Sequence, residues 1–289
     1  MDFDKTEGKI IKGVGGLYRV LTENGTAECR PRGALRKTNL KPVIGDACVI
    51  SGSGGAWTIE SISERRNELT RPRVSNIDAV VAVCAADSPN LYLLDKYLII
   101  LGEQAAAGSF QIIVLINKTD LADKNEISKI KKDYGRAGYP TVFFSALKKT
   151  GTDELLGLIR GRTAALAGVS GVGKSSVVNL LCGGTVMETG GLSKKISRGK
   201  HTTRHAEMFP VDGGFVIDTP GFASLNFDNA SRGTLKNFFA DFNEFTAGCR
   251  YADCAHIGEP DCGVKAQAGK KLSASRYGNY LRLYNEISV

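Results

Sequence analysis

"GVSGVGKS", residues 168–175, decides the fold of the central part of this chain. The apolar segment before it and the residues after it predict a buried strand, a flexible loop and the first turn of a helix. In this arrangement backbone N–H groups wrap phosphates, Lys174 neutralises the charge of the outer phosphates, and Ser175 binds Mg²⁺. The predicted phosphate-binding residues are Gly168, Val169, Ser170, Gly171, Val172, Gly173, Lys174, Ser175 and Ser176.

Strand and helix patterns alternate around this loop, from Ile77 to Gly221. The segments "IDAVVAVCAAD", "FQIIVLINK", "TVFFSA" and "TAALAGV" are apolar runs typical of buried parallel strands, and helical patterns lie between them. The sequence therefore predicts a doubly wound α/β domain.

"GGFVIDTPG" (213–221) ends a further apolar strand of this domain. Asp218 is placed to hold the Mg²⁺ shell through water, and the N–H of Gly221 to meet the γ-phosphate. A switch threonine is expected in "KHTTRH" (200–205), where two threonines are equally eligible. The predicted magnesium residues are therefore Ser175, Thr202, Thr203 and Asp218.

"NKTD" (117–120) follows a strand and predicts which base is bound. Asp120 can accept hydrogen bonds from the ring N–H and the exocyclic amine of guanine together, whereas adenine lacks this amine and would leave the carboxylate unpaired. Asn117 and Lys118 would brace the loop and cover the base. Together with the phosphate loop, the predicted GTP-binding residues are Asn117, Lys118, Thr119, Asp120, Ser145, Ala146, Asp218 and Gly221.

The order of these motifs predicts a circularly permuted domain. "FSAL" (144–147) contributes Ser145 and Ala146, whose backbone N–H would donate to the guanine oxygen. Ordinary GTPases place the phosphate loop first, whereas here the base motifs precede it. A parallel sheet cut at an exposed loop keeps its strand neighbours, so the same pocket can form. The chain leaving Gly221 must then run outward to the final third.

The group that activates water is less clearly marked in the sequence. Phe222 stands where many GTPases carry a water-orienting glutamine, so hydrolysis by the isolated protein should be slow. His201 is the best local substitute, and an RNA-facing position for this histidine is the equally weighted alternative. The predicted catalytic residues are His201, Lys174, Thr202 and Thr203.

"CRYADCAHIGEPDC" (249–262) predicts a metal site in the final third of the chain. A set of three cysteines and one histidine suits tetrahedral Zn²⁺ with no open position. The predicted ligands are Cys249, Cys254, His256 and Cys262. The remaining cysteines, Cys29, Cys48, Cys84 and Cys182, are expected to be small buried hydrophobic residues.

The N-terminal part has a different pattern, because short β-prone segments alternate there with glycine-rich turns. No long helical period appears, which favours a small β-barrel of the oligonucleotide-binding (OB) type. We therefore expect a multidomain chain with an OB-type barrel at 1–68, a permuted GTPase domain at 69–226 and an α-rich zinc domain at 227–289.

Charge and hydropathy indicate the class of partner. The chain of 289 residues carries 38 Lys+Arg and 30 Asp+Glu, a net charge of +8. Its basic clusters are "RPRGALRKTNLK" (30–41), "KKISRGKHTTR" (194–204), and a set comprising Lys265, Lys270, Lys271, Arg276 and Arg282. Each cluster alone is typical of solvated surface, but three together favour a large polyanion such as RNA. No apolar run approaches the ~18 residues of a membrane span, and the N-terminus lacks a signal core, so we expect a cytoplasmic protein. Nothing in the sequence indicates more than a monomer, which is the expected oligomeric state.

Taken in order, the motifs "ERRNELTRP", "NKTD", "GVSGVGKSS", "RGKHTTRH", "DTPGF" and "CRYADCAHIGEPDC" give a more specific result. With them the chain resembles, over nearly its whole length, the ribosome small subunit-dependent GTPase A (RsgA/YjeQ) family of circularly permuted GTPases. This resemblance implies an OB domain, a GTPase domain and a zinc domain. It also implies GTP hydrolysis stimulated by the 30S subunit during its late maturation, with 16S rRNA as a partner.

The residues alone leave two classes of function open. One is an assembly factor that hydrolyses GTP, and the other is an RNA-binding scaffold whose nucleotide serves structure only. The phosphate-loop lysine and serine and Asp218 favour the first class. A metabolic ATPase or kinase is disfavoured by Asp120.

Overall fold

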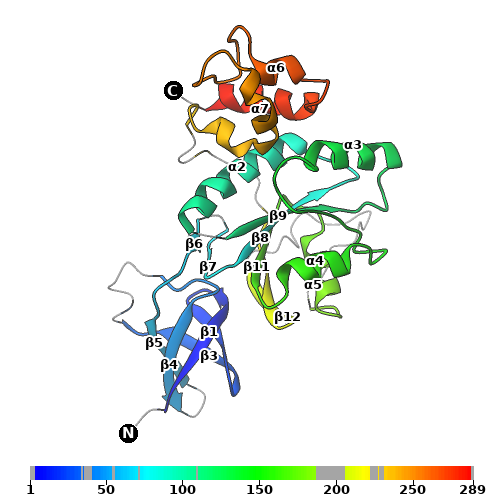
Figure 1. Ribbon diagram of the computed structural model, residues 1–289. Coiled ribbons are helices and arrows are strands. Elements are labelled where there is room, and N and C mark those ends of the chain that lie inside the picture. The colour runs from blue at the N-terminus through cyan, green and yellow to red at the C-terminus, as the bar shows by residue number, and fades with distance from the viewer. Residues whose placement is uncertain are drawn as a thin grey trace, which may run out of the picture.

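The computed structural model shows three parts that follow one another along the molecule (Figure 1). A β-barrel lies at one end, an α/β layer in the middle, and a small helical part at the other end. The structure describes residues 4–33, 35, 41–53, 56–70, 72–108, 110–186, 206–221, 227 and 231–287. None of the helices in these residues has the combination of length and hydrophobicity that a membrane span requires.

The N-terminal part is a closed five-stranded barrel. Its strands are β1 (Asp4–Val14), β2 (Leu17–Thr22), β3 (Gly25–Pro31), β4 (Ala47–Ser53) and β5 (Ala56–Ile62). They pair in the order β1-β2-β3-β5-β4, and β4 returns to β1. The β3–β5 pair is parallel and the other pairs are antiparallel. The predicted OB-type barrel is thereby confirmed, and its core includes Ile10, Val20, Ile50 and Ile59.

The central part is a mostly parallel sheet between two layers of helices. Its strands are β8 (Ala79–Ala85), β9 (Gln111–Asn117), β10 (Thr141–Phe143), β11 (Thr163–Ala167), β12 (Glu207–Val211) and β13 (Gly214–Asp218). They lie in the order β10-β9-β8-β11-β13-β12, with only β12 antiparallel to its neighbour β13. All residues of β8 and β11 are buried, as their apolar sequences predict. The doubly wound α/β domain is thereby confirmed.

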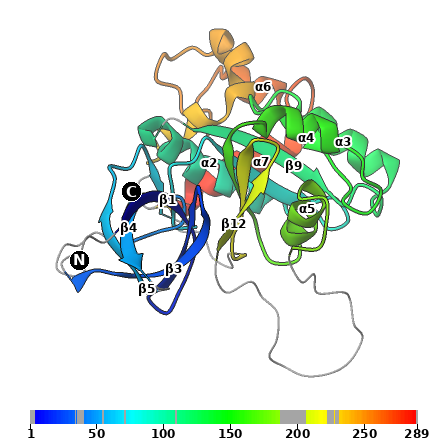
Figure 2. The ribbon, with the colours of Figure 1, turned by 90° about the horizontal axis from the view of Figure 1, so that it is seen from below.

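The helices of the central part cover the sheet on both faces (Figure 2). They are α2 (Leu91–Gly108), α3 (Lys124–Tyr134), α4 (Thr152–Ile159) and α5 (Lys174–Leu181). The side chains of α2 and α3 share one hydrophobic core with the sheet, and those of α4 and α5 share another. The phosphate-loop strand β11 lies between the base-motif strands and β13, so the permuted chain order does not disturb the order of strands in space.

The barrel and the central sheet are joined edge to edge, which the sequence analysis did not predict. Strand β1 pairs with β12 at Lys12 and Glu207, so one sheet of 11 strands runs through both parts. The register of β1 against β2 shifts between Ile10 and Lys12. Ile11, at this irregularity, packs against the core of the central part.

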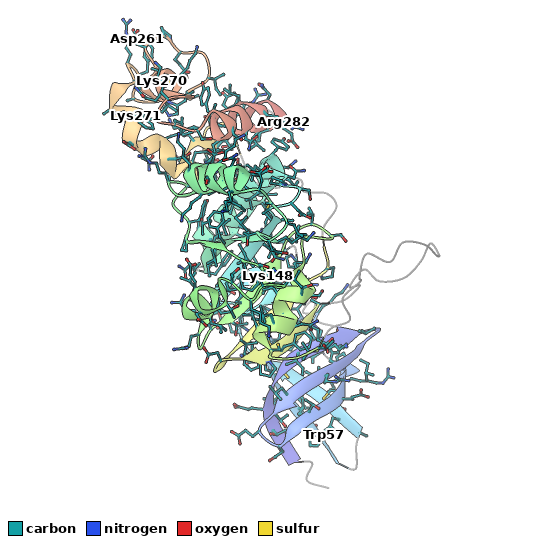
Figure 3. All side chains as sticks on the ribbon, turned by 90° about the vertical axis from the view of Figure 1, so that its right-hand side faces the viewer. Trp57, Lys148, Asp261, Lys270, Lys271 and Arg282 are labelled. Atoms are coloured by element: carbon teal, nitrogen blue, oxygen red, sulfur yellow. The ribbon has the colours of Figure 1, made fainter. Side chains whose placement is uncertain are left out.

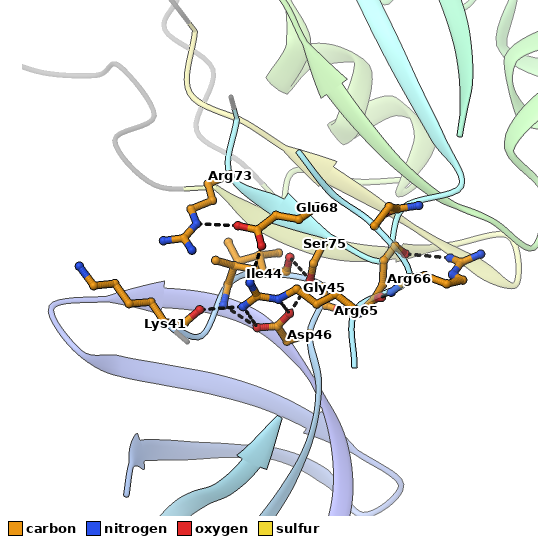
Figure 4. Close-up of polar contacts among 12 residues, drawn as sticks. Lys41, Ile44, Gly45, Asp46, Arg65, Arg66, Glu68, Arg73 and Ser75 are labelled. Carbon is orange, nitrogen blue, oxygen red and sulfur yellow. Dashed lines mark hydrogen bonds and ion pairs between the residues drawn. The ribbon is translucent and has the colours of Figure 1, made fainter. Parts of the chain in front are cut away.

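A buried network of charges also connects the two parts (Figure 4). Asp46 is fully buried, and Arg65 donates to its carboxylate from Nε and Nη2 at 2.7 and 2.8 Å. The same carboxylate accepts hydrogen bonds from Ser75 Oγ at 2.6 Å and from the N–H of Val43 at 2.8 Å. The four donors satisfy this buried charge, which would otherwise be costly.

The hairpin of β6 (Glu68–Leu69) and β7 (Val74–Ser75) completes this junction. Glu68 accepts hydrogen bonds from both Arg65 and Arg73, the latter at 2.8 Å. Gly45 has a φ of +96°, and a Cβ there would lie 2.0 Å from the Ser75 carbonyl oxygen. The segment "ERRNELTRP" therefore has a structural role, because it holds the barrel against the central part.

The C-terminal part packs on α2. It contains the 3₁₀ helices η1 (Leu235–Phe238) and η2 (Ala240–Gly248) and the α-helices α6 (Gly263–Gln267) and α7 (Ala274–Glu286). Ile99 of α2 belongs to its hydrophobic core. A Cβ at Gly102 would lie 2.6 Å from the ring of Phe238, so the close approach of η1 to α2 favours glycine there.

Arg276 forms the buried polar centre of this interface. It donates to Asp241 from Nε and Nη2 at 2.9 Å each, and to Asp95 of α2 at 2.5 Å. Asp95 also accepts hydrogen bonds from Tyr134 at 2.9 Å and Asn279 at 2.7 Å. Only 2% of Arg276 is exposed, so its assignment to a basic surface cluster was wrong.

Replacing Arg276 should destabilise the C-terminal part. Arg276→Met removes one buried charge and leaves two buried carboxylates without their cationic partner, which should lower the free energy of unfolding by about 3–5 kcal/mol. Urea unfolding followed by far-UV circular dichroism measures this change. Arg282→Ala is the matched control, because this arginine is exposed on the same helix and should cost less than about 1 kcal/mol. Equal losses for both variants would contradict the expectation.

The cysteines outside the predicted metal site are mostly buried, as expected. Cys29, Cys48 and Cys84 are each less than 10% exposed. Burial raises the pKa of the Cys29 and Cys84 thiols to about 11. Cys182 is only half-buried, because it follows the last turn of α5 beside exposed glycines, so the prediction was wrong for this residue.

Candidate nucleotide and metal sites

The phosphate-loop sequence forms the turn between β11 and α5. Gly171 and Gly173 have φ of +86° and +91°, which side chains other than glycine rarely adopt. A Cβ at Gly168 would lie 2.5 Å from the carbonyl oxygen of Val83. The loop is thereby held against the end of β8, and α5 begins at Lys174.

Lys174 lies over this loop and is 7% exposed. Its ammonium donates to the carbonyl oxygens of Gly168 at 2.8 Å and Val169 at 3.1 Å. Burial lowers its pKa, while nearby Asp218 raises it. Among the described residues the hydrogen-bond acceptors of this buried cation are neutral carbonyl oxygens, so it is well placed to receive an anion.

Ser175 and Asp218 meet at the end of the sheet. The serine hydroxyl donates to Asp218 Oδ2 at 2.8 Å. Asp218 Oδ1 is buried and has no hydrogen-bond partner among the described residues. Burial raises the pKa of this carboxyl, and the hydrogen bond from Ser175 opposes the rise. The hydroxyl and the orphaned carboxylate are oxygen donors of the kind that Mg²⁺ prefers, so the two residues fit this ion.

Gly221 lies directly against the phosphate loop. A Cβ at this position would be 2.7 Å from the backbone nitrogen of Ser170. Thr219 anchors the same segment, because its hydroxyl donates to the carbonyl oxygen of Leu166 at 2.6 Å. The end of "DTPG" therefore lies next to the loop, as the sequence predicts.

The base-motif loop is tied to the phosphate loop. Asn117 donates to the carbonyl oxygen of Val172 at 2.8 Å. Lys118 has a φ of +61°, and its ammonium lies 3.3 Å from Asp87. The hydroxyl of Thr119 donates to the carbonyl oxygen at position 144 at 3.1 Å, which connects the ends of β9 and β10.

Asp120 and Ser145 form the predicted base-reading pair. The serine hydroxyl donates to Asp120 Oδ1 and accepts a hydrogen bond from the N–H of Lys148 at 2.9 Å. Asp120 and Ala146 both line a cleft of about 540 Å³ that continues to Gly173 at the phosphate loop. The structure thus brings the two base motifs and the phosphate loop to one cleft.

One wall of this cleft consists of residues that the sequence motifs did not predict. It is made by the end of α5 and the following turn, comprising Asn179, Leu180, Gly183, Gly184 and Thr185. Leu121 and Leu147, also in the cleft lining, are 62% and 74% exposed and available to contact a base. The glycine pair after α5 is the sequence signal that could have pointed to this wall.

Some predicted residues cannot be placed. His201, Thr202 and Thr203 lie outside the described residues, and so does Phe222. The switch threonine and the catalytic role of the histidine therefore stay predictions.

The predicted metal ligands meet in the C-terminal part. The ligand atoms of Cys249, Cys254, His256 and Cys262 all lie within 4.8 Å of one another. His256 Nδ1 is 3.6 Å from the sulfur of Cys249 and 3.5 Å from that of Cys262. Three thiols and one imidazole can fill all four positions of a tetrahedral ion, so the donor set fits Zn²⁺ in a closed structural site.

Hydrogen bonds around the cluster hold its loops. The carboxylate of Glu259 accepts from the N–H of Ala255 at 2.6 Å and of Ile257 at 2.9 Å. The Tyr277 hydroxyl donates to the carbonyl oxygen of His256 at 2.9 Å. Burial raises the pKa of Cys254 to about 12 and lowers the pKa of His256. A bound cation would reverse the first effect by stabilising the thiolate.

Basic residues remain exposed at both ends of the molecule. Figure 3 shows Lys270 and Lys271 at the tip of the C-terminal part, and Trp57 in the barrel at the opposite end. In the barrel, Arg32 forms an ion pair with Glu60. Arg30, Arg32 and Lys41 of the cluster at 30–41 are described and exposed, whereas the cluster at 194–204 lies outside the described residues.

Comparisons with known proteins agree with this architecture. A family model described as RsgA N-terminal domain matches residues 7–55, and one described as RsgA GTPase matches residues 62–228. Small ribosomal subunit biogenesis GTPase RsgA of Clostridium beijerinckii is 40% identical over 284 residues, which cover 97% of each chain. The protein of the same name from Alkaliphilus metalliredigens is 39% identical over 289 residues, 98% of each chain.

Two solved structures share the fold over almost the whole chain. YjeQ from Thermotoga maritima is 32% identical, with a TM-score of 0.72 and 98% of each chain covered. YloQ, described as a circularly permuted GTPase, is 33% identical with a TM-score of 0.71, covering 98% of this chain and 95% of the other.

Proposed function

Because this chain belongs to the RsgA family of GTPases, we propose that it binds the small ribosomal subunit, acts in its late maturation, and hydrolyses GTP faster when bound there. Hydrolysis of GTP is the activity of the family. The observation that carries the proposal is that the base loop and the phosphate loop line one cleft despite their permuted order, while Asp218 accepts a hydrogen bond from Ser175 in the first turn of α5.

The nucleotide is proposed to bind with its base beside Asp120 and Ala146 and its phosphates in the loop at 168–173. Lys174 and the N–H of Gly221 would contact the γ-phosphate, with Ser175 and Asp218 holding Mg²⁺. Water attacks the γ-phosphorus while the oxygen bridging to the β-phosphate leaves, and this chain's cationic and N–H groups stabilise the developing charge. When bound, Mg²⁺ supplies further positive charge there.

The partners and the second metal follow from the same proposal. Zn²⁺, one ion per chain, is proposed at the Cys₃His cluster in a structural role. The exposed basic residues of the barrel and the C-terminal part are proposed to contact 16S rRNA. A monomer in the cytoplasm is the proposed form and location.

GTP turnover with and without purified small subunits tests this function. Subunits should accelerate hydrolysis by the wild-type protein. His201→Ala should keep its affinity for GTP and its binding to the subunit, but lose about 10²-fold of the stimulated rate, because the imidazole is proposed to position water. Single-turnover hydrolysis on saturating subunits measures chemistry apart from binding and release.

Lys174→Ala is the comparison variant, since it should lose nucleotide binding itself. If His201→Ala hydrolyses GTP at the wild-type rate, the histidine is not catalytic, and the group that activates water belongs to the ribosome. Turnover that small subunits do not change would instead favour an RNA-binding scaffold with a structural nucleotide.

A further inference from the structure

We propose that two residues outside the nucleotide motifs, Lys12 of the barrel and Glu207 of β12, are positioning residues of the magnesium site. They would set the electric field that the ion meets at Asp218. This inference rests on the proposed function, because it takes Ser175 and Asp218 as the residues that hold Mg²⁺.

The three residues stand in one row across three neighbouring strands. Glu207 is directly opposite Asp218 in the β12–β13 ladder, and Lys12 is directly opposite Glu207 in the β1–β12 pair. Side chains at directly opposite positions share a face of the sheet and are about 5 Å apart at Cβ. The row therefore leads from the barrel to the carboxylate that accepts the hydrogen bond of Ser175.

Of the three charged residues in this row, Lys12 is positive, whereas Glu207 and Asp218 are negative. Glu207 places a second carboxylate beside Asp218, and Lys12 compensates it through an ion pair of 2.7 Å. The side chains of Lys12 and Glu207 are 36% and 19% exposed. Solvent therefore weakens the effect of their charges at the magnesium site but does not abolish it. A divalent ion responds to each of these charges with twice the energy of a monovalent one.

The barrel is fixed firmly enough to hold Lys12 in this place. Ile11, next to it in β1, packs into the core of the central part together with Met208 of β12. The buried network of Asp46 and Arg65 anchors the barrel a second time. Two separate attachments therefore keep Lys12 beside Glu207.

Release of the fluorescent nucleotide mant-GDP, measured across a MgCl₂ titration, tests the proposal without relying on hydrolysis. Lys12→Gln leaves Glu207 uncompensated, so the Mg²⁺ concentration for half-maximal slowing of release should fall roughly three- to tenfold. Glu207→Gln leaves Lys12 uncompensated, and the same concentration should rise by a similar factor. The double variant removes no net charge and should return close to wild type.

Asp212→Asn is the matched control. Asp212 lies in the turn of the same β12–β13 hairpin and forms an ion pair of 2.7 Å with Arg160, on the order of 15 Å along the strand from Glu207. Its Mg²⁺ titration should equal that of the wild type. Thermal unfolding of all variants identifies any loss of folded protein, which would affect the two single variants alike.

Three results would overturn the inference: titrations that coincide for all variants, shifts of both single variants in the same direction, or a shift as large in Asp212→Asn. A different result would contradict the proposed function, namely wild-type protein that binds neither mant-GDP nor small subunits. If wild-type release does not depend on Mg²⁺, both the magnesium site and this inference are wrong.

Discussion

Asp120→Asn is expected to change the binding preference of the protein from guanine to xanthine nucleotides. The carboxylate can only accept hydrogen bonds, which suits the N–H groups of guanine, whereas an amide can donate to the 2-oxo group of xanthine. Affinity for GTP should fall by about 10³-fold or more, because a site built on paired hydrogen bonds rejects a mismatched partner strongly. Competition of GTP and XTP against mant-GDP for the wild type, and against mant-XDP for the variant, measures the exchange.

Ser145→Ala is the matched control for this prediction. It removes the hydroxyl that donates to Asp120 but leaves the carboxylate in place. Affinity for GTP should weaken by about tenfold, and the preference for guanine should remain. If Asp120→Asn still prefers GTP to XTP, this residue does not read the base.

Cys254→Ala is expected to release the metal and unfold the C-terminal part. Metal binding supplies on the order of 10 kcal/mol to the folding of small zinc domains. Two of the metal ligands, Cys254 and Cys262, also belong to the hydrophobic core of this part. Metal analysis by mass spectrometry should find one zinc per wild-type chain and none in the variant. Hydrogen exchange should show lost protection in α7 and retained protection in β8 and β11.

Cys182→Ala serves as the control, because Cys182 is half-buried and lies in the central part. It should keep one zinc per chain and the wild-type exchange pattern. Wild-type protein that is purified without chelators and contains no zinc would contradict the assignment of the metal.

The fold could be predicted from the sequence where local pattern and burial agree. The strands β8 and β11 are apolar at every position because both faces of the sheet are covered. The Cys₃His cluster could be predicted because its ligands lie within 14 consecutive residues, 249–262. The domain boundaries and the roles of the nucleotide-site residues stay predictions.

What could not be predicted depends on pairs far apart in the chain. In the sequence Arg276 cannot be told from an exposed basic residue, because its partners Asp241 and Asp95 are 35 and 181 residues away. Lys12 and Glu207 are 195 residues apart, and nothing in either segment marks the pairing of β1 with β12. The wall after α5 belongs to no nucleotide motif, and its glycine pair indicates a turn in the sequence but not the position of that turn at the cleft.

The seam between β1 and β12 also limits how this protein can be divided. A shortened chain that begins after β5 would remove the strand that pairs with Glu207 of β12 and expose the apolar surface against which Ile11 packs. An open, unpaired strand edge beside exposed apolar surface is a template for aggregation. The nucleotide-binding part should therefore stay soluble more readily when it is expressed together with the barrel.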